Sequence, residues 1–577
     1  MEGEHDGAFG ERMTTGISQS PLMPYASGIS GRRDQAFPVL SETEIARMAR
    51  FGERQEYRRG ERLITAGERA PGMFVVLKGA LTATQRDGLG HVVPIVRHGP
   101  GQFTGEVAQL SSGVALVDAE ADDDVEVLLI PPDRIRALIV AEAELGERIV
   151  RALILRRVAH IESDGTGPVL IGELQSPDML RLENFLRRNG QPHHAVDPSQ
   201  DAAAGMLFAQ YGASPHDVLV VCANGSMLLT PSEDSLARCL GMLDTLERDD
   251  LFDVAVVGAG PAGLATAVYA ASEGLRVIVI ECRSFGGQAG ASARIENYLG
   301  FPTGISGQAL AGRAFVQAQK FGAEMLIPAQ VASLDCAQTG RDGELRLKLT
   351  DGRTLRSRTV VIASGARYRR PAVPRLAEFQ GRGIWYWASV LEAKLCAGED
   401  VAIIGGGNSA GQAAVFLANH ASMVHMLIRG EGLAASMSRY LIDRIAATPS
   451  IELHPHTEVV QLCGDTGGRL ASISWRDQRT GIETTHRVRN LFVFIGAAPE
   501  TEWLDGCGVV LDAHGFVVTG APVQTAEGRV PVTLESSVPG VYAVGDVRSG
   551  SVKRVGGAIG EGAAAVALIH EHLSKSR

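Results

Sequence analysis

Two glycine-rich turns are the segments of this chain best suited to do chemistry. Each follows a short apolar strand and opens a helical pattern; they read DVAVVGAGPAG at 253–263 and DVAIIGGGNSA at 400–410. Glycines at this spacing allow a tight turn and let the backbone approach a pyrophosphate, which the free N–H groups of the helix start can bind. The two turns therefore predict two dinucleotide-binding sites.

The first turn has the complete pattern of such a site. Its contact residues would be Gly258, Gly260, Pro261, Ala262 and Gly263. The next strand, LRVIVIE, ends at Glu281, 23 residues after the first glycine, where a carboxylate can accept hydrogen bonds from both hydroxyls of a ribose. The strand, the helix and the acid together favour a dinucleotide site over a merely glycine-rich turn.

The second turn departs from this pattern at two positions. Its contact residues would be Gly405, Gly407, Asn408, Ser409 and Ala410, with the alanine in the place of the third glycine. Its next strand, MVHMLIR, ends in Arg429, so that a base replaces the acid. An arginine there can pair with the 2′-phosphate of NADPH, which favours NADPH over NADH; a solvated strand-end arginine is the alternative.

Two dinucleotide sites in one chain imply two cofactors. Hydride transfer between a nicotinamide and a flavin is the simplest chemistry that uses both. We therefore expect FAD at the first turn and NADPH, or else NADH, at the second. Two Rossmann-like α/β domains must then position the turns.

The segment 251–577 resembles the thioredoxin reductase group of FAD- and NAD(P)H-binding flavoproteins, in the class II pyridine nucleotide-disulfide oxidoreductase family. The resemblance is carried by GAGPAG, FGGQ, IENYLGFP, VVIASGA, GGGNSA, VHMLIRG, FVFIGAAPET, GVYAVGDV and KRVGGAIGEGAAA, in family order. It implies a homodimer and an FAD domain in two pieces, 250–366 and 495–577, with the NAD(P)H domain, 367–494, inserted between them. It also implies cofactor contacts at Gly287, Gln288, Asn297, Val331, Ser364, Gly365, Asp546, Arg554 and Val555.

The same resemblance assigns roles to the last of these residues. Asp546 would meet the ribityl chain of the flavin. The final helix would begin beneath the flavin ring near Arg554 and Val555, where its dipole can tune the N1–O2 edge.

The chain lacks the dithiol that the resemblance calls for. Trp387 and Val390 occupy the two cysteine positions in GIWYWASVLEA, and the nearest thiol, Cys396, lies nine residues beyond Trp387. A dithiol relay needs two sulfurs within bonding reach, so thioredoxin reduction by the family mechanism is disfavoured and we expect no catalytic side chain. Trp387 would either pack near the isoalloxazine or fill an apolar interface. The other cysteines in this half are expected to lie without a partner: Cys282, Cys336, Cys463 and Cys507.

Residues 166–245 resemble a thioredoxin- or glutaredoxin-like unit. The order of strand, turn, helix and strand is present, but Ser176-Pro177-Asp178-Met179 stands where relatives have CPxC. Ser176 can cap the helix but cannot do redox chemistry. We expect a docking or spacer module.

Residues 37–162 resemble a cyclic-nucleotide-binding domain, a β-roll with a helical tail, behind a flexible arm at 1–36. Gly105-Glu106 matches the cassette that holds the ribose, but Ala115 stands where an arginine would pair with the cyclic phosphate. A buried phosphate without a positive partner is costly, so cyclic-nucleotide binding is doubtful and a structural or partner-binding unit is favoured. The expected fold class is thus multidomain: β-roll, small thioredoxin-like α/β unit and two Rossmann-like domains.

Composition limits the remaining function classes. The 577 residues carry a net charge of −11, which disfavours a broad nucleic-acid surface. The seven cysteines form no CxxC and suggest neither a disulfide framework nor a metal site. The N-terminus lacks a signal-peptide core, and no apolar run is long enough for a membrane span, so we expect a cytoplasmic protein.

Three hypotheses follow. The first is an enzyme that passes electrons from NADPH through FAD to an external acceptor, such as a small protein carrier, a quinone, dioxygen or the disulfide of a partner. The second is a redox- or nucleotide-sensing flavoprotein with negligible turnover. The third is a thioredoxin reductase that uses a non-standard cysteine.

Overall fold

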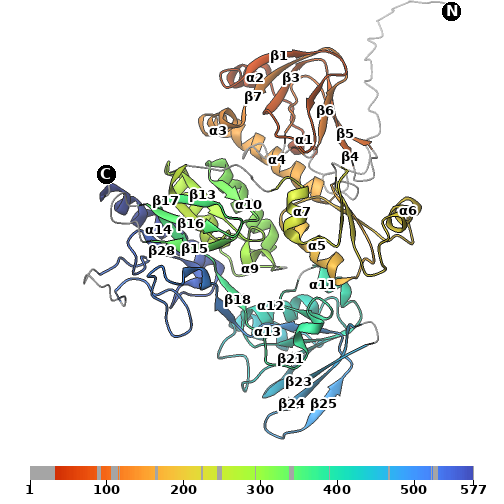
Figure 1. Ribbon diagram of the computed structural model, residues 1–577, viewed down its shortest axis with the longest axis vertical. Coiled ribbons are helices and arrows are strands. Elements are labelled where there is room, and N and C mark those ends of the chain that lie inside the picture. The colour runs from red at the N-terminus through yellow and green to blue at the C-terminus, as the bar shows by residue number, and fades with distance from the viewer. Residues whose placement is uncertain are drawn as a thin grey trace, which may run out of the picture.

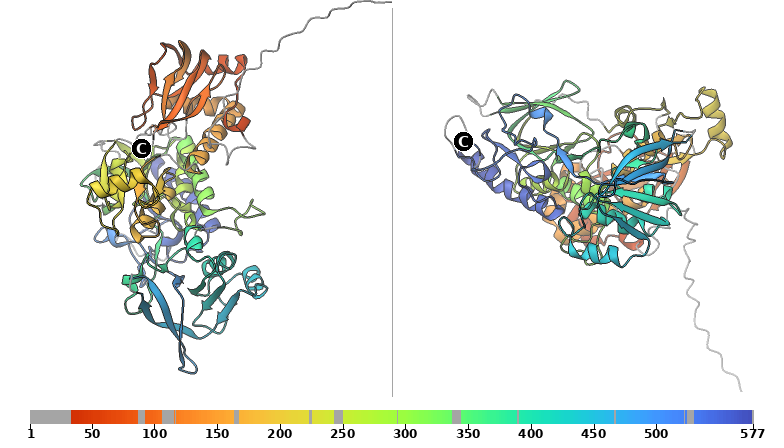
Figure 2. Two further views of the ribbon diagram at one scale, coloured as in Figure 1. Left: turned by 90° about the vertical axis from the view of Figure 1, so that its right-hand side faces the viewer. Right: turned by 90° about the horizontal axis from the view of Figure 1, so that it is seen from below.

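Four structural units follow one another along the chain, and the long helix α4 leads from the first of them toward the others (Figure 1). The computed structural model describes residues 33–86, 92–105, 115, 117–162, 167–222, 225–242, 250–292, 294–336, 344–388, 390–465, 468–521, 523 and 530–575. The β-roll lies at one end of the molecule and strands β23 to β25 lie at the other, as the side view in Figure 2 also shows. None of the helices in these ranges combines the length and hydropathy that a bilayer span needs.

The first unit is a β-roll of two antiparallel sheets. Its elements are α1 (Arg33–Ala36), α2 (Glu42–Met48), β1 (Glu53–Tyr57), β2 (Arg62–Ile64), β3 (Met73–Lys78), β4 (Leu81–Arg86), β5 (Val92–His98), β6 (Asp118–Ala121), β7 (Val125–Ile130), α3 (Pro132–Ala141) and α4 (Ala143–Glu162). The strand orders are β1-β7-β3 and β2-β6-β4-β5. The inward residues of β3 and β7 fill the two cores between these sheets and the helices, as alternating apolar positions dictate.

The expected flexible arm ends earlier than the sequence suggested. Residues 1–32 lie outside the described ranges, but 33–36 form helix α1, which packs on α4. Ala36 is fully buried, and its carbonyl accepts a hydrogen bond from Arg156 Nε at 2.8 Å. The prediction of an arm is therefore wrong for these four residues, because a long-range contact with α4 orders them.

The second unit is a four-stranded sheet with helices on both faces. Its elements are β8 (Val169–Ile171), α5 (Pro177–Arg188), β9 (His194–Val196), α6 (Ala202–Gln210), β10 (Leu219–Val221), β11 (Met227–Leu229) and α7 (Glu233–Cys239). The strand order is β11-β10-β8-β9, with β8 and β9 parallel and the other pairs antiparallel. Ser176 caps α5 by accepting the Met179 N–H at 3.2 Å, as expected.

The third unit is assembled from two separate stretches of chain. Its elements are β12 (Leu251–Val257), α8 (Pro261–Ser272), β13 (Val277–Ile280), α9 (Gly287–Gly290), α10 (Gly307–Lys320), β14 (Glu324–Leu326), β15 (Val331–Asp335), β16 (Leu345–Leu349), β17 (Thr354–Ile362), and later the 3-10 turns η4 (Glu502–Leu504) and η5 (Gly545–Val547), β28 (Val541–Ala543) and α14 (Val555–Lys575). Strand β28 returns from the C-terminal stretch to pair with β17 in parallel. Helices α8, α10 and α14 cover one face of the sheet, and the meander of β15 and β16 covers the other.

The fourth unit is inserted between those two stretches. Its elements are the 3-10 turn η3 (Leu376–Phe379), β19 (Ile384–Trp385), α11 (Val390–Leu395), β20 (Asp400–Ile404), α12 (Asn408–Leu417), β21 (Met423–Leu427), α13 (Arg439–Ala446), β22 (Ile451–His454), β23 (Thr457–Gly464), β24 (Leu470–Asp477), β25 (Glu483–His486) and β26 (Asn490–Val493). The parallel sheet has the order β19-β26-β20-β21-β22. Helices cover one face, while the antiparallel sheet β23-β24-β25 covers the other.

An antiparallel ribbon connects the third and fourth units. Strands β18 (Ala366–Tyr368) and β27 (Ala497–Pro499) pair where the chain leaves and re-enters the third unit. Arg367 and Glu500 form an ion pair beside the ribbon, and Arg444 of α13 pairs with Glu296 at 2.8 Å from the other unit. The two units are thus held together by paired backbone and by charge.

Candidate functional site

The first glycine-rich turn lies between β12 and α8 and is shaped to admit a phosphate. Gly258 has a φ of +113°, and a Cβ there would lie 2.2 Å from the carbonyl oxygen of Ala363. Gly260 is the N-cap of α8, and a Cβ there would meet nothing nearer than the Cα of Gly287, at 3.9 Å. The helix start therefore leaves space beside Gly260 in which a pyrophosphate could approach the backbone. Pro261 begins α8, and the buried Ala262 and Gly263 follow it.

The acid at the end of the second strand lies beside this turn. Glu281 follows β13, and its Oε2 accepts the Ala259 N–H at 2.9 Å, which fixes the carboxylate next to the phosphate-binding backbone. The Glu281 carbonyl accepts the Ala329 N–H at 2.7 Å. This bond holds the segment that leads to Val331, the buried first residue of β15, next to Glu281. This arrangement fits the ribose and adenine end of a dinucleotide.

The other residues expected to contact the flavin come from separate segments. Gln288 on α9 donates a hydrogen bond to the Ala366 carbonyl, and its neighbour Gly287 faces the first turn. The Ser364 hydroxyl donates to the Glu500 carbonyl at 2.8 Å, and Gly365 follows it at the start of the ribbon. Asn297 is exposed in the loop before α10.

Asp546 is held in place by a residue of the final helix. Glu561 of α14 accepts the Gly545 N–H at 2.7 Å and pairs with Arg548 at 2.6 Å, which clamps the η5 turn that carries Asp546. Burial raises the pKa of the Asp546 carboxyl, and the Asp546 carbonyl accepts a hydrogen bond from Lys553 Nζ at 2.5 Å. Arg554 is exposed directly before Val555, the first residue of α14. A half-buried carboxyl at the start of this helix fits a hydroxyl-bearing ligand.

The second glycine-rich turn repeats the geometry of the first. Gly405 has a φ of +134°, and a Cβ there would lie 2.2 Å from the Phe494 carbonyl oxygen. Gly407 is the N-cap of α12, and a Cβ there would meet only the Ser436 carbonyl oxygen, at 4.0 Å. Asn408 Oδ1 accepts the Ser438 N–H at 2.7 Å, and Ala410 is fully buried against the strand. The turn therefore leaves room for a second pyrophosphate.

Two residues that the sequence predicts for the second site are exposed. Ser409 lies in the first turn of α12 with its side chain in solvent. Arg429 lies two residues beyond the end of β21 and is exposed. An exposed arginine near the end of β21 is available to a ligand that carries an additional phosphate.

Trp387 is the first of the two residues that the sequence resemblance places at a cysteine position. Trp387 is half-buried and donates its Nε1–H to Glu392 Oε1 on α11 at 2.9 Å. Trp385, two residues earlier, is 6% exposed, packs in the helix-side core of the fourth unit and donates to Asn490 Oδ1. Trp385 is thus an ordinary core residue, whereas Trp387 lies shortly before helix α11 and is hydrogen-bonded to it.

Two pairs of cysteines correct the expectation of isolated thiols. Cys222 and Cys239 form a disulfide in the second unit, with their Cα atoms 6.5 Å apart. Cys336 and Cys507 are hydrogen-bonded neighbours; the bond from the Cys336 thiol holds the pKa of Cys507 at about 7 and raises that of Cys336. Sequence spacing could not reveal these contacts, because residues 17 and 171 positions apart are brought together by the sheets.

The second unit contacts both Rossmann-like units. Arg188, at the end of α5, donates to the Gly287 carbonyl at 2.7 Å, and Glu233 of α7 forms a two-bond ion pair with Arg283 at 2.8 Å. At the other end of α5, Leu180 packs against the core of the fourth unit. The second unit therefore contacts both the unit that carries the first glycine-rich turn and the unit that carries the second.

The nucleotide cassette of the β-roll is described only in part. Gly105 is placed, and its carbonyl accepts a hydrogen bond from the buried Arg156 at 3.1 Å. Glu106 lies outside the described residues. Ala115 is buried in the core of the roll, as a small apolar residue should be.

Two family models match separate parts of the chain. A family model described as pyridine nucleotide-disulphide oxidoreductase matches residues 252–562, and one described as cyclic nucleotide-binding domain matches residues 54–142. A relative from Arabidopsis thaliana, NADPH-dependent thioredoxin reductase 3, is 34% identical over 56% of this chain and 59% of its own. One subunit of the alkyl hydroperoxide reductase of Escherichia coli (strain K12) is 30% identical over 58% of this chain and 60% of its own.

Solved structures show the same fold in the reductase-like half. Thioredoxin reductase of T. acidophilum is 29% identical with a TM-score of 0.50, and covers 56% of this chain and 98% of its own. Thioredoxin reductase of Lactococcus lactis is 24% identical with a TM-score of 0.51, over 56% and 99%. The chain spans about 60% of the length of the curated relatives named above.

Proposed function

Because the chain belongs to the pyridine nucleotide-disulphide oxidoreductase family, we propose that it is an NAD(P)H-dependent flavoprotein oxidoreductase that delivers electrons to an external acceptor. FAD supplies hydride acceptance and onward electron transfer when bound, and NADPH supplies the hydride. The first turn, Glu281 and Asp546 would hold FAD. The second turn and Arg429 would hold NADPH.

The observation that carries this proposal is the open space at the first residues of two helices, α8 and α12. Gly260 and Gly407 each begin a helix, and each would leave its added Cβ at least 3.9 Å from the nearest protein atom. Gly258 and Gly405, by contrast, are pressed against carbonyls of the neighbouring strand connection and shape the turn. Close packing behind an open helix start is what a bound pyrophosphate needs, and it occurs twice.

The residues at the expected dithiol position favour transfer of electrons from the flavin to an external acceptor. Trp387 and Val390 carry no sulfur, so this helix start offers no thiol to accept electrons. In this proposal the protein binds and orients the cofactors through backbone N–H groups and charged side chains. No side chain acts as a catalytic acid or base. The start of α14 at Arg554 and Val555 would stabilise negative charge through its dipole. The proposed acceptor is a small protein carrier, a quinone, dioxygen or a partner's disulfide.

An anaerobic reduction experiment on the full-length protein tests the proposal. The purified protein should contain about one FAD per chain, and NADPH should bleach the flavin absorbance faster than NADH does. The reduced protein is then mixed with each class of acceptor, and reoxidation is followed. A chain that binds no FAD, or whose flavin neither nicotinamide reduces, would refute the proposal. Light scattering on the same sample tests the homodimer that the family resemblance implies.

The Cys336–Cys507 pair gives the non-standard thioredoxin reductase hypothesis a specific form. These two thiols are hydrogen-bonded, and Cys507 has the lowered pKa of a more readily ionised thiol. The double variant C336S/C507S should retain full NADPH-driven reduction of every acceptor if electrons leave the flavin directly. Selective loss of disulfide reduction in this variant would establish the cysteine route instead.

The sensor hypothesis can be tested because the β-roll contacts the proposed FAD unit. A cavity of about 690 Å³ lies between α3 and α4 on one side and α10 on the other, lined in part by Ile139, Arg151, Arg313 and Phe321. A sensor should bind a ligand of the β-roll with different affinity before and after flavin reduction. Cyclic AMP and cyclic GMP are the first probes; equal affinity in both redox states, or no binding, favours the enzyme.

A further inference from the structure

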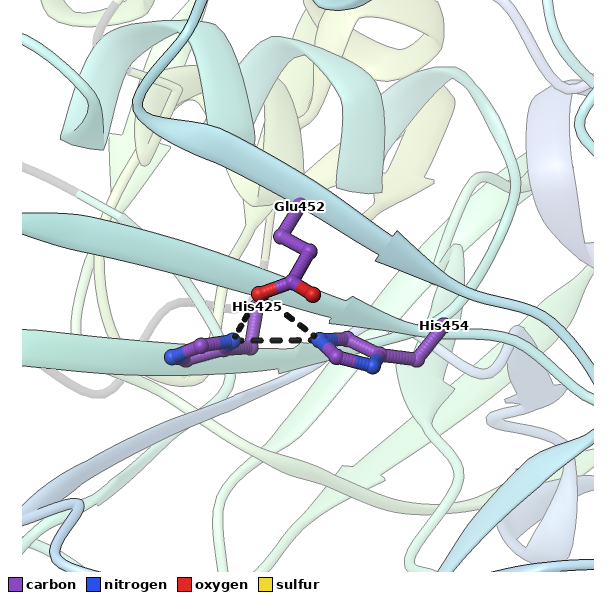
Figure 3. A group of neighbouring side chains, drawn as sticks. All are labelled: His425, Glu452 and His454. Carbon is purple, nitrogen blue, oxygen red and sulfur yellow. Dashed lines mark hydrogen bonds and ion pairs between the residues drawn. The ribbon is translucent and has the colours of Figure 1, made fainter.

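Two histidines and a glutamate converge on two neighbouring strands of the fourth unit. His425 lies on β21, and Glu452 and His454 lie on β22, the edge strand of the parallel sheet (Figure 3). The register pairs His425 with Glu452. Because side chains alternate along a strand, Glu452 and His454 share a face, and their pairing places His425 on it as well.

The three nearest ligand atoms form a compact triangle. His425 Nδ1 lies 3.1 Å from His454 Nε2, while Glu452 Oε2 lies 3.4 Å from the first nitrogen and 3.5 Å from the second. Ligands at about 2.0–2.1 Å from a tetrahedral Zn²⁺ are about 3.3–3.4 Å apart, so the observed edges match this geometry. Each residue offers one such atom to a common point between them.

Hydrogen bonding alone accounts poorly for this triangle. A neutral imidazole, the form that binds metals, has one N–H and one nitrogen lone pair. One proton between the two nitrogens makes a single N–H···N bond. The carboxylate oxygen then faces the rings at 3.4–3.5 Å, beyond the usual hydrogen-bond range. A cation at the centre would satisfy all three lone pairs at once.

The surroundings hold the two rings in position and leave one side open. The His425 and His454 side chains are 12% and 21% exposed, and the ring of Trp475 on β24 lies 5.5 and 5.4 Å from theirs. Glu452 is 56% exposed, so the site is reached from solvent. Trp475 is itself stacked on His486 at 3.6 Å. Preorganised donors beside an accessible face are the properties of a built metal site.

We propose that His425, Glu452 and His454 bind a Zn²⁺ ion, with water in the fourth position. Two imidazoles and a carboxylate are a donor set that selects zinc and its first-row neighbours over Mg²⁺ and Ca²⁺, which prefer oxygen ligands alone. Cysteine spacing predicted no metal site, whereas these ligands meet only through the pairing of β21 with β22.

The ion would fasten the edge strand next to the proposed NADPH site. The Ile428 N–H donates to the His454 carbonyl at 3.0 Å, and Arg429 is the following residue. A metal that joins β21 to β22 therefore stabilises the strand end from which Arg429 projects. The site itself does not depend on the proposed activity, and its test needs no turnover.

Metal titration of the full-length chain tests this site. Protein freed of metal with a chelator is titrated with Zn²⁺ against a chromogenic competitor, and bound metal is counted after gel filtration. We expect about one tight Zn²⁺ per chain, a higher thermal midpoint with Zn²⁺ but not with Mg²⁺ or Ca²⁺, and a tetrahedral absorption spectrum with Co²⁺ in its place. Absence of tight Zn²⁺ binding would overturn the proposal.

Ligand and control variants then locate the ion. Loss of an outer-sphere partner weakens metal binding by about 10- to 100-fold. His454→Gln and Glu452→Gln each remove a direct ligand, so each should weaken Zn²⁺ binding by more than that. His420→Gln is the matched control, since its ring lies against Phe416 on α12 in the same unit. Glu452 is exposed, so E452Q should fold even if a histidine variant does not. Unchanged Zn²⁺ affinity in E452Q, or equal loss in H420Q, would contradict the assignment.

Discussion

The Nε1–H of Trp387 donates a 2.9 Å hydrogen bond to the carboxylate of Glu392 on helix α11. Glu392 is 4% exposed, so the indole supplies a donor to a buried acid. This contact ties Trp387 to helix α11 and gives the residue a structural task independent of any flavin.

The first prediction separates that task from a flavin contact. Trp387→Phe keeps an aromatic ring but removes the donor to a buried carboxylate, which should cost about 1–3 kcal/mol. We expect a lower thermal midpoint and an unchanged absorbance spectrum of the bound flavin. Trp503→Phe, which removes an indole that donates to the Glu500 carbonyl at 3.1 Å, is the control. A shifted flavin spectrum with unchanged stability would show instead that the indole lies against the isoalloxazine.

The second prediction concerns nicotinamide selectivity. Arg429→Ala should raise KM for NADPH by about 10- to 150-fold, since a hydrogen bond to a charged group contributes about 1.5–3 kcal/mol. KM for NADH should change by about twofold or less, because NADH lacks the 2′-phosphate. Arg439→Ala removes an 85% exposed arginine of the same unit and should affect neither. Equal KM increases for both cofactors would show that Arg429 does not read the phosphate.

The third prediction addresses the clamp on Asp546. In Glu561→Gln one carboxylate oxygen becomes an NH₂ group, so either the Gly545 N–H or Arg548 loses its acceptor. We expect about tenfold weaker FAD binding, measured as loss of flavin on dilution and gel filtration. Glu571→Gln on the same helix, where the carboxylate pairs with Lys575 in solvent, should retain the flavin. Full retention in E561Q would mean that the η5 turn holds its shape unaided.

The fourth prediction is a pH dependence of the β-roll. Burial and the nearby Arg156 lower the pKa of His98 to about 3, whereas an unfolded histidine titrates near 6.5. Between these values the unfolded state binds the additional proton, so stability falls as pH falls, by up to about 1.4 kcal/mol per pH unit.

His98→Phe should flatten that dependence. The imidazole Nδ1 has no hydrogen-bond partner in the described part of the structure, so an apolar ring of similar size can replace it. The measurement is the thermal unfolding midpoint of the full-length protein and the variant between pH 7 and pH 4. Parallel curves for both proteins would show that His98 titrates normally.

Local sequence was sufficient for the reductase-like fold, and the family comparison confirms the two-cofactor framework. The apolar strands before both turns, the glycines within them and the acid at Glu281 are features of short segments. Their backbone requirements are local, since a strand that enters a helix through a tight turn needs glycine wherever it occurs. That residues 387 and 390 are Trp and Val is likewise known from the sequence alone, and their correspondence to a dithiol stays a prediction.

Tertiary structure decided the contacts between segments. The Cys222–Cys239 disulfide, the Cys336–Cys507 hydrogen bond and the His425–Glu452–His454 triangle all join residues on separate elements. Packing of the elements brings the cysteines together, whereas the register of β21 on β22 brings the triangle together, since a shift of one residue would turn every side chain to the opposite face. The chain itself thus specifies which groups it can offer to cofactors, while the pairing of its sheets specifies which of those groups meet.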